Sequence, residues 1–268
     1  MSNSDLTVLI HSCHKFSDLW PAHTKLLSQN WPDRKIRTII LTDDAEECYY
    51  DSIEIISAGH GKEMTERIRH VLPLINTKYL LVTLDDYFPI YPISSDKIFR
   101  LVDIMEKEQL DYIRLFPHPK CPEVKTKYEG IGIISLDGDY RVNLYAGLWT
   151  KDFIAATLGD KVLNAWDFEV SLTANARKAN GKCAVSHGNE FPILDVVRKG
   201  KILPNAYKYL KKHNLYHGNR EMMPYKAVYK LNIKTFWARL FSKLPFPVYK
   251  AIKRICVKFG MKSFSANK

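Results

Sequence analysis

The feature of this sequence that most constrains its fold is a series of continuous apolar segments separated by helical patterns. In the first half, short apolar segments that suit buried strands alternate with stretches in which apolar residues recur every three to four positions. Continuous apolar strands that alternate with helices are typical of a mostly parallel sheet covered on both faces. We therefore expect an α/β fold, with strands at residues 6–13, 36–42, 52–57 and 79–84 and helices at 18–30 and 62–75.

The second half of the sequence has a less regular pattern. Asp137-Gly138-Asp139 separates two apolar segments, and such a turn sequence is typical of a β-hairpin. Asn164 precedes an apolar-periodic stretch and is a suitable helix cap. We expect helices at 94–108, 151–158 and 165–180, strands at 111–116 and 182–186, and a hairpin of residues 131–136 and 140–145.

Charge divides the chain into two parts. The whole sequence has 40 Lys and Arg against 29 Asp and Glu, a net charge of +11. Residues 201–268 hold 16 of those basic residues and one acid, Glu221, which gives this tail +15 and leaves −4 for residues 1–200. A mildly acidic body with a cationic tail indicates attachment to an anionic surface.

Two segments of the tail carry apolar stripes at helical spacing. Residues 234–244 and 248–259 place Phe, Trp, Leu, Ile and Val on one face and Lys and Arg on the other, with a proline break between them. We expect basic amphipathic helices that bind the membrane surface peripherally, where Lys and Arg meet anionic lipid. Packing on the globule or on another subunit is the alternative. Nucleic acid is disfavoured as a partner, because no nucleic-acid motif is present and the body is acidic.

The sequence has no pattern of a signal peptide, and no apolar run reaches the roughly 18 residues that a membrane-spanning helix needs. Its cysteines are odd in number and widely spaced, which is typical of a reducing compartment rather than of a disulfide-stapled fold. They are Cys13, Cys48, Cys121, Cys183 and Cys256. We therefore expect a cytoplasmic protein, on the cytoplasmic face of the membrane if the tail binds there.

Polar residues follow three of the expected strands at the point where each strand ends. In open α/β sheets, ligands bind beyond the carboxyl ends of the strands. We expect a site lined by the loop at Ser12, by Asp43 and Asp44, and by Asp85 and Asp86.

The sharpest of these segments is YLLVTLDDYF, residues 79–88, in which two adjacent carboxylates follow a buried strand. Mg²⁺ and Mn²⁺ prefer carboxylate oxygens, with phosphate oxygens and water completing the shell. The alternative is that Asp85 and Asp86 only begin a turn before Pro89.

The order strand, helix, strand ending in Asp, helix containing Arg67, and then TKYLLVTLDD resembles the nucleotide-sugar-binding half of a GT-A-fold glycosyltransferase. The later GLW (147–149) and AWDFE (165–169) segments resemble those of bacterial glycosyltransferases that build capsule or lipopolysaccharide. The resemblance covers about residues 6–200. It implies a GT-A-like catalytic domain at 1–203, divided into a nucleotide-sugar-binding half (1–92) and an acceptor half (93–203), followed by the basic tail at 204–268.

The resemblance also implies a donor site and a divalent cofactor, Mn²⁺ or Mg²⁺. A standard Asp-x-Asp is absent, because Tyr87 occupies the position two after Asp85. Asp86 matches the metal-binding second Asp of the family pattern, and Asp85 matches its variable middle position. The donor would contact Ser12, Asp43, Asp44, Arg67, Asp85 and Asp86.

Glycosyl transfer to an alcohol needs a base that takes the acceptor proton. The resemblance favours Glu169 in this role, and aromatic neighbours would raise its pKa by desolvation. Asp167 is the second candidate, although it could instead satisfy helix amides. The alternative for both is that acids are favoured at a helix N-terminus.

Two further groups are candidates for the site. Trp149, after Gly147, could form a platform for donor or acceptor sugar, or could be a core tryptophan. The loop at 186–201 could cover the diphosphate, with His187 as a metal ligand and Arg198, Lys199 and Lys201 neutralising the leaving group. The alternative is a solvated basic surface.

These features predict an enzyme that moves a sugar from a nucleoside-diphosphate donor, with UDP as the expected nucleotide, to a hydroxyl of a surface glycan or lipid-linked glycan. Inversion follows if Glu169 is the base. Another nucleotide-binding enzyme, a nucleotidyltransferase, is one alternative, although its Gly-rich loop is missing from HSCHKF after the first strand. A non-catalytic protein that uses the tail to bind membranes or partners is the other.

Overall fold

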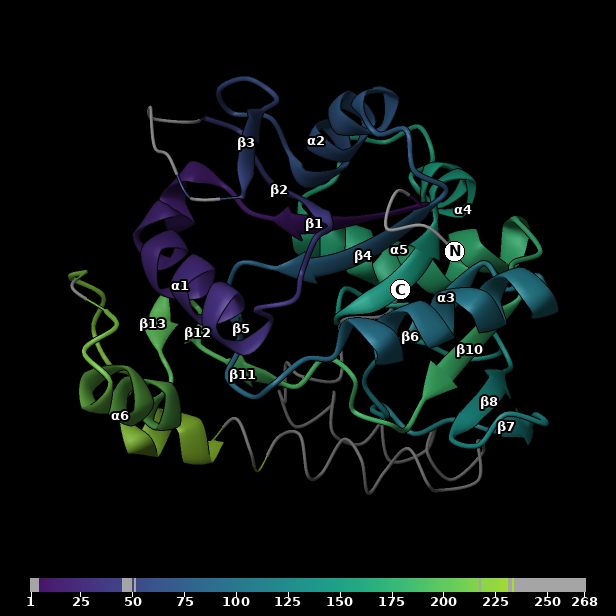
Figure 1. The fold of residues 1–268 in the computed structure, drawn as a ribbon. Helices are drawn as coiled ribbons and strands as arrows, with labels where there is room; N and C mark the ends of the chain where they lie inside the picture. The colour runs from purple at the N-terminus through teal and green to yellow at the C-terminus, as the bar shows by residue number, and fades with distance from the viewer. Residues whose placement is uncertain (1–4, 45–49, 51, 217, 231–232, 234–268) are drawn as a thin grey trace, which may run out of the picture. The chain divides into compact units, whose positions relative to one another are not determined.

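The structure is a computed structural model that describes residues 5–44, 50, 52–216, 218–230 and 233. Its fold is α/β, with a mixed, mostly parallel central sheet flanked by helices (Figure 1). The helices are α1 (Trp20–Asn30), α2 (Met64–Val71), α3 (Ser95–Glu108), α4 (Lys151–Thr157), α5 (Ala165–Lys178) and α6 (Pro204–Lys212). The central strands are β1 (Leu6–His11), β2 (Arg37–Thr42), β3 (Glu54–Ser57), β4 (Tyr79–Leu84), β6 (Tyr112–Arg114), β7 (Glu123–Lys125), β8 (Ile131–Ile134), β9 (Gly147–Thr150) and β10 (Cys183–Ser186).

The nine strands follow the order β3-β2-β1-β4-β9-β6-β10-β8-β7. The first four are parallel neighbours, and β9 enters antiparallel between β4 and β6. β6 and β10 are again parallel, while β8 runs against both β10 and β7. The carboxyl ends of β1, β2, β4, β6 and β10 therefore meet at one edge of the sheet.

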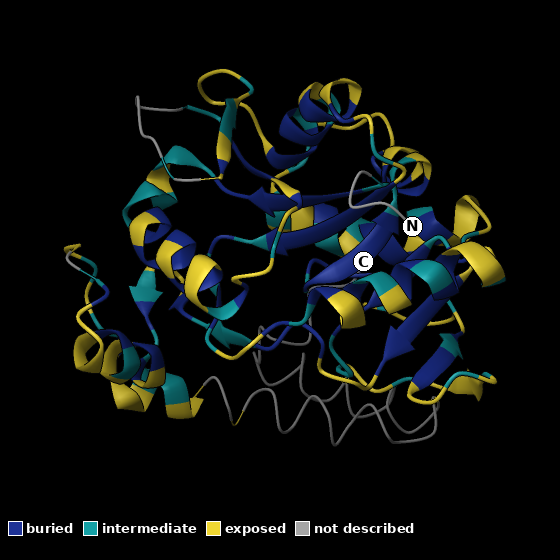
Figure 2. Cartoon of the chain, in the orientation of Figure 1, coloured by how far each residue is buried: buried dark blue, intermediate teal, exposed yellow. Residues whose placement is uncertain are grey.

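Both faces of the sheet are covered, as the continuous apolar strands require. Val8 and Ile10 of β1 pack with α1 and α3 in one core, whereas Leu9 packs with α2, α4 and α5 in the other. This alternation places successive side chains of a single strand in two cores. Figure 2 shows the result, with buried central strands and helices that are exposed only on their outer faces.

Local chemistry explains where the helices begin. The Ser94 hydroxyl accepts a hydrogen bond from the Lys97 amide and starts α3. The Asn164 side chain accepts from the amides of Trp166 and Asp167, which confirms it as the cap of α5. The Glu63 and Glu66 side chains form a reciprocal capping box at the start of α2.

The predicted hairpin is wrong in its second strand. β8 forms, but it pairs with β7 and β10, and residues 140–145 form no strand. Side chains of α5 form hydrogen bonds with the backbone of this segment instead. The Thr173 hydroxyl bonds to both the amide and the carbonyl of Val142, and Glu169 accepts from the Leu144 amide. The predicted first helix also begins late, since a 3-10 helix at His14–Leu19 precedes α1.

The chain forms two compact units. The first comprises residues up to Val196 together with Tyr209–Asn219, and the second comprises Val197–Lys208 with the chain from Arg220 onward. In the second unit, β12 (Val197–Arg198) and β13 (Lys201–Ile202) form a short hairpin. The predicted boundary at residue 203 stays a prediction.

The two amphipathic helices predicted at 234–244 and 248–259 lie outside the described residues. Within the part of the chain that the structure describes, no helix is both long enough and apolar enough to cross a bilayer. Cys13, Cys121 and Cys183 are free thiols.

Candidate functional site

Three of the predicted donor residues lie together because β1, β2 and β4 are adjacent and parallel. His11 pairs with Leu41 on one side and with Leu84 on the other, so the strand ends are level. The residues that follow these strands, Ser12, Asp43 and Asp85, therefore gather at the carboxyl edge of the sheet.

Asp85 is held inside this edge rather than presented to solvent. It is 6% exposed, and the Ser12 hydroxyl donates a hydrogen bond to its carboxylate. Ser12 in turn accepts from the Trp20 indole at 2.7 Å, and the Asp85 carbonyl lies 2.9 Å from the ring nitrogen Nδ1 of buried His23. Asp85 is thus part of the framework that joins β1, α1 and β4.

Asp43 and Arg67 form the electrostatic centre beside β2. Burial tends to raise the pKa of Asp43, but hydrogen bonds from the His14 amide at 2.7 Å and from its own amide, together with nearby Arg67, lower it below its ordinary value. Arg67 is 9% exposed, and its Nη1 donates to the Lys62 carbonyl at 2.5 Å. Burial and the charge of Arg67 lower the pKa of His11 to about 3, so this histidine is neutral. The guanidinium of Arg67 therefore lies near the carboxyl ends of β1 and β2, where a donor phosphate is expected.

Asp86 begins a segment that pairs with a part of the chain about a hundred residues away. β5 (Tyr87–Pro89) pairs antiparallel with β11 (Ile193–Asp195), so that Asp195 lies opposite Tyr87. The Asp86 carbonyl accepts a hydrogen bond from the Val196 amide at 2.9 Å. The loop after β10 therefore returns across the acidic pair.

Tyr87 lies among the carboxylates of three different segments. Burial raises the pKa of its hydroxyl far above the ordinary value, and Tyr145, Asp86, Asp195 and Glu169 raise it further. The hydroxyl is consequently protonated at any ordinary pH. Tyr87 directly follows Asp86 and stacks on Tyr145, and the amide of the adjacent Leu144 bonds to Glu169, so the acidic pair and the carboxylate of WDFE lie near one another.

Glu169 has the environment that a general base needs. It lies on the second turn of α5, and burial raises its pKa above the ordinary glutamate value. The Leu144 amide donates to its Oε1 at 3.3 Å, which opposes the shift and orients the carboxylate. Asp167 differs, since it is exposed and accepts a hydrogen bond from the Asn164 side chain at 2.8 Å. The structure thus gives Asp167 a place in the helix cap.

A row of half-buried rings extends away from Asp86 at the same edge. Tyr87 stacks on Tyr145 with centroids 5.3 Å apart and planes at 7°, and Tyr145 stacks on Phe116 at 4.7 Å. Phe116 then contacts the His118 ring at 5.5 Å. We call Tyr87, Tyr145, Phe116 and His118 the aromatic row.

Trp149 and Gly147 are not part of this surface. Trp149 is 1% exposed and packs between Tyr112 and Phe153 in the core, which corrects the predicted sugar platform. Gly147 has a packing role, because a Cβ there would lie 2.7 Å from the Tyr112 ring.

His187 does not lie beside Asp86. Two strands, β9 and β6, separate β4 from β10, so the two residues follow strands about 14 Å apart at the usual spacing of about 4.8 Å. The His187 ring nitrogen Nε2 instead lies 3.0 Å from the Glu123 carboxylate. The predicted pairing of Asp86 and His187 as metal ligands is therefore wrong for this structure.

The remaining predicted residues are Asp44 and the three basic residues of the predicted diphosphate loop. Asp44 contacts the His60 ring at 3.1 Å and is partly exposed. The three basic residues of the predicted diphosphate loop belong to the second unit, where Arg198 and Lys201 face each other in the β12–β13 hairpin, Lys199 forms its turn, and Lys201 pairs with Glu221.

Across the described ranges, no three His, Cys, Asp or Glu side chains gather as a metal-binding group. A divalent cation at Asp86 would thus need ligands from the bound donor as well, which is how Mg²⁺ is commonly held beside phosphates. A cavity of about 630 Å³ lies at the opposite edge of the sheet, around Lys78, Tyr79 and Glu106, away from this site.

Sequence reasoning missed Asp195, Tyr87, Tyr145 and Phe116. Asp195 lies in the predicted basic loop, but only the β5–β11 pairing brings it to the acidic pair. The signal for Tyr87 was present, since an aromatic residue directly after two acids at a strand end must lie at the same edge.

No family model matches the sequence, and no curated protein matches it. Among solved structures, the chain is similar to the mannosyltransferase PcManGT from Pyrobaculum calidifontis in complex with GDP-Man and Mn²⁺, with a TM-score of 0.47 and 8% identity over 73% of this chain and 58% of that chain. It is also similar to S. aureus TarS 1-349 in complex with UDP-GlcNAc (TM-score 0.45, 11% identity, 74% of this chain and 60% of that chain). A third match is the bifunctional IspDF from Campylobacter jejuni (TM-score 0.42, 16% identity, 72% of this chain and 52% of that chain).

This chain spans about half to three fifths of the length of these structures. The likeness is distant and concerns the arrangement of the α/β fold alone.

Proposed function

We propose that this chain is a glycosyltransferase that moves a sugar from a nucleoside-diphosphate donor, UDP being the expected nucleotide, to a hydroxyl of a surface-glycan acceptor. The observation that carries the proposal is the position of Tyr87, which follows Asp86 and stacks on Tyr145, next to the Leu144 amide that bonds to Glu169. A donor-binding acid and a candidate base thereby border one region at the ligand-binding edge of the sheet.

Glu169 is the proposed general base. In a single displacement, its carboxylate takes the proton of the acceptor hydroxyl while the acceptor oxygen forms a bond to the anomeric carbon. The bond between that carbon and the diphosphate oxygen breaks, and the nucleoside diphosphate leaves with the electron pair. The raised pKa of Glu169 supports this role, because a carboxylate with higher proton affinity is the better base.

The donor is proposed to lie over β1 and β2. Asp43 and the loop at Ser12 would contact the nucleoside, and Arg67 would meet the negative charge of the diphosphate as it increases on departure. The buried guanidinium of Arg67 beside Asp43 supports this assignment.

Asp86 is the proposed protein ligand of Mn²⁺ or Mg²⁺, together with oxygens of the donor diphosphate. When bound, such an ion would stabilise negative charge on the leaving group. Asp85 supports Asp86 from within the framework, since its carboxylate is engaged by Ser12.

A thermal-shift panel of UDP- and GDP-sugars, each with and without Mn²⁺, tests the donor class. We expect stabilisation by one nucleotide sugar that Mn²⁺ increases and that Asp86→Asn abolishes, with transfer to a glycan acceptor in the same conditions. Release of pyrophosphate from a nucleoside triphosphate and a sugar phosphate would instead make the chain a nucleotidyltransferase. Stabilisation by no donor would contradict both activities and favour a binding protein.

The basic tail is proposed to hold the enzyme at an anionic membrane surface, where a lipid-linked acceptor is found. Its net charge of +15 supports this proposal. Sedimentation of the full chain with vesicles of phosphatidylglycerol, but not with vesicles of phosphatidylcholine, is the expected result. Equal sedimentation with both, or with neither, would contradict it.

A further inference from the structure

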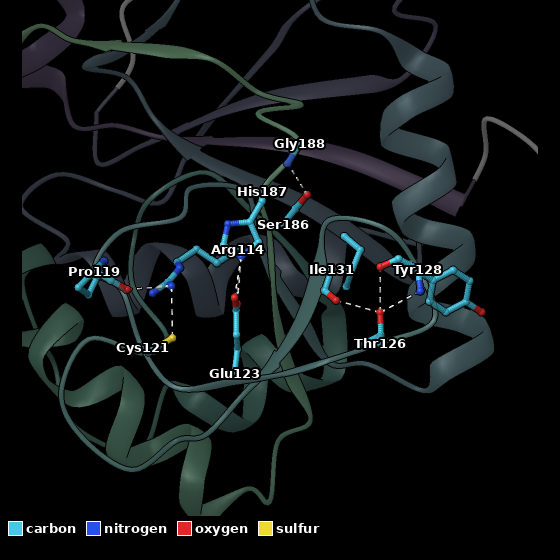
Figure 3. Close-up of polar contacts among 10 residues, drawn as sticks. All are labelled: Arg114, Pro119, Cys121, Glu123, Thr126, Tyr128, Ile131, Ser186, His187 and Gly188. Carbon is cyan, nitrogen blue, oxygen red and sulfur yellow. Dashed lines mark hydrogen bonds and ion pairs between the residues drawn. The ribbon is translucent and has the colours of Figure 1, made fainter.

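A second cavity, of about 360 Å³, lies beyond the carboxyl ends of β6 and β10. Arg114, at the end of β6, and His187, directly after β10, form part of its wall. Figure 3 shows the polar contacts of both side chains. His118, Lys120, Cys121 and Glu123 also line it. The proposed reaction site at Asp86 does not include this cavity. Asp86 follows β4, and the strands β9 and β6 lie between β4 and β10.

The cavity contains a buried guanidinium whose described partners are all neutral. Arg114 is 0% exposed; its Nη2 donates to the Pro119 carbonyl at 3.0 Å and lies 3.7 Å from the Cys121 sulfur. Its Nη1 makes only long contacts with the carbonyls of Tyr140 and Arg141, at 3.4 and 3.5 Å, and its Nε is buried without a partner. Buried charges in proteins are normally paired with an opposite charge.

The one acid in the wall does not supply that opposite charge. The Glu123 carboxylate is directed to the His187 ring, 3.0 Å from its Nε2, and makes no ion pair with Arg114 (Figure 3). Gly132 makes room for this arrangement, because a Cβ there would lie 2.6 Å from the Glu123 Oε2. Exposed Lys120 adds a second positive charge at the rim. The cavity is therefore cationic.

The aromatic row connects this cavity to the proposed reaction site. The row begins at Tyr87, next to Asp86, and ends at His118, which lines the cavity. A glycan that runs along the row, in contact with the ring edges and the tyrosine hydroxyls, would place one end beside Arg114.

We propose that this cavity binds the anionic group, a carboxylate or a phosphate, of an acidic sugar in the acceptor, with Arg114 as its counter-charge. The inference rests on the proposed glycosyltransferase function for the identity of the ligand as an acceptor. Guanidinium groups bind planar oxyanions through paired, charge-assisted hydrogen bonds. A volume of about 360 Å³ lies at the small end of the range for ligand pockets and suits a single sugar residue.

The test measures binding to the full chain in the absence of any donor, so that it is independent of transfer. The probes are glucuronate, inorganic phosphate and, as the neutral comparison, glucose. Alkylation of the half-buried Cys121 by iodoacetamide, followed by mass spectrometry of its peptide, reports occupation of the cavity. We expect glucuronate or phosphate to slow this alkylation at least fivefold and glucose to leave it unchanged; protection by only one of the two anions identifies the group that is recognised.

Three variants link the protection to the charge. Arg114→Lys keeps the charge but loses the paired donors, and Lys120→Ala removes the rim charge at an exposed side chain. Each should weaken anion binding about tenfold. Lys107→Ala, an exposed lysine of α3, is the matched control and should leave it unchanged. Equal protection by glucose, or unchanged anion binding in both Arg114→Lys and Lys120→Ala, would overturn the proposal.

The two proposals fail in different ways. If anions bind as expected but no nucleotide sugar is turned over, the cavity remains an anion site and the glycosyltransferase proposal falls. If a sugar is transferred equally well to neutral and acidic acceptors, and anions leave Cys121 unprotected, only the acceptor proposal falls.

Discussion

The Ser12 hydroxyl donates a hydrogen bond to the Asp85 carboxylate, and this contact joins the ends of two adjacent parallel strands. The Trp20 indole donates to the same Ser12 oxygen, so β1, β4 and α1 meet at one buried polar group. The two acids of the LDDYF segment thereby have different environments: Asp85 is fixed within the framework, and Asp86 is the one assigned to the ligand.

Ser12→Ala should destabilise the protein by about 1–3 kcal/mol, because it removes a hydrogen bond from the buried Asp85 carboxylate and the acceptor of the Trp20 indole. Urea denaturation measures the change. Ser135→Ala is the control, since its hydroxyl bonds to Asp137 at 3.0 Å on the exposed surface, and a change within about 0.5 kcal/mol is expected there. Equal losses of unfolding free energy in the two variants would show that the buried hydrogen bonds of Ser12 contribute no more to stability than the exposed one of Ser135.

Asp86→Asn should reduce sugar transfer by about 10²-fold or more, as is usual when a group that stabilises developing charge is removed. Its melting temperature should remain close to that of the parent, because the Asp86 side chain is half-buried and its carbonyl keeps the bond from Val196. Steady-state kinetics with the identified donor, with Mn²⁺ varied, measure both the loss and the metal dependence. Parental turnover in this variant would contradict the assignment of Asp86.

Much of the framework could be predicted from the sequence, because many of its apolar segments are long and periodic. The strand predicted at 79–84 is confirmed at both ends, and the helix predicted at 94–108 begins one residue later, at Ser95. Asn164 could be identified as a cap because an Asn side chain accepts hydrogen bonds from the first amides of a helix. These features depend only on local chemistry.

The parts that were missed depend on contacts between distant segments. β9 is four residues long and contains Gly147, so no local pattern marks it as a central strand. Residues 140–145 have an apolar alternation, yet α5 takes up their backbone groups. Asp195 reaches the site only through the β5–β11 pairing, which no spacing within either segment reveals.

Gly147→Ala should destabilise the fold by about 1–3 kcal/mol, because the added methyl group would meet the fully buried Tyr112 ring, 2.7 Å away. Thermal and urea denaturation measure the change. In the double variant Gly147→Ala with Tyr112→Leu, the methyl group no longer meets the ring, so the cost of the alanine should be smaller than in the parent. The same cost in both backgrounds would mean that Gly147 has another role, such as the sugar contact first expected of it.

Glu169→Gln should change both the pH dependence of activity and that of stability. Burial raises the pKa of Glu169 above 4.5, so kcat/KM of the parent should fall with decreasing pH as this carboxylate is protonated, with a midpoint above the ordinary glutamate value. The glutamine keeps an oxygen for the Leu144 amide but cannot take a proton. Transfer should therefore fall by 10²- to 10⁴-fold, and the fall of kcat/KM at acidic pH (the acidic limb) should disappear.

The stability readout has the opposite sign to that of an ion-paired acid. Since the folded state favours the protonated form of Glu169, the folded protein binds more protons than the unfolded chain once the pH exceeds about 4.5, and the parent loses stability as the pH rises through the folded-state pKa. The melting temperature of Glu169→Gln relative to the parent should accordingly be higher at neutral pH than at pH 4. Asp167→Asn, at the exposed cap two residues away, should change neither profile. An unchanged acidic limb in Glu169→Gln would assign the base to another group, and Asp195, which also acts on Tyr87, would be the next to test.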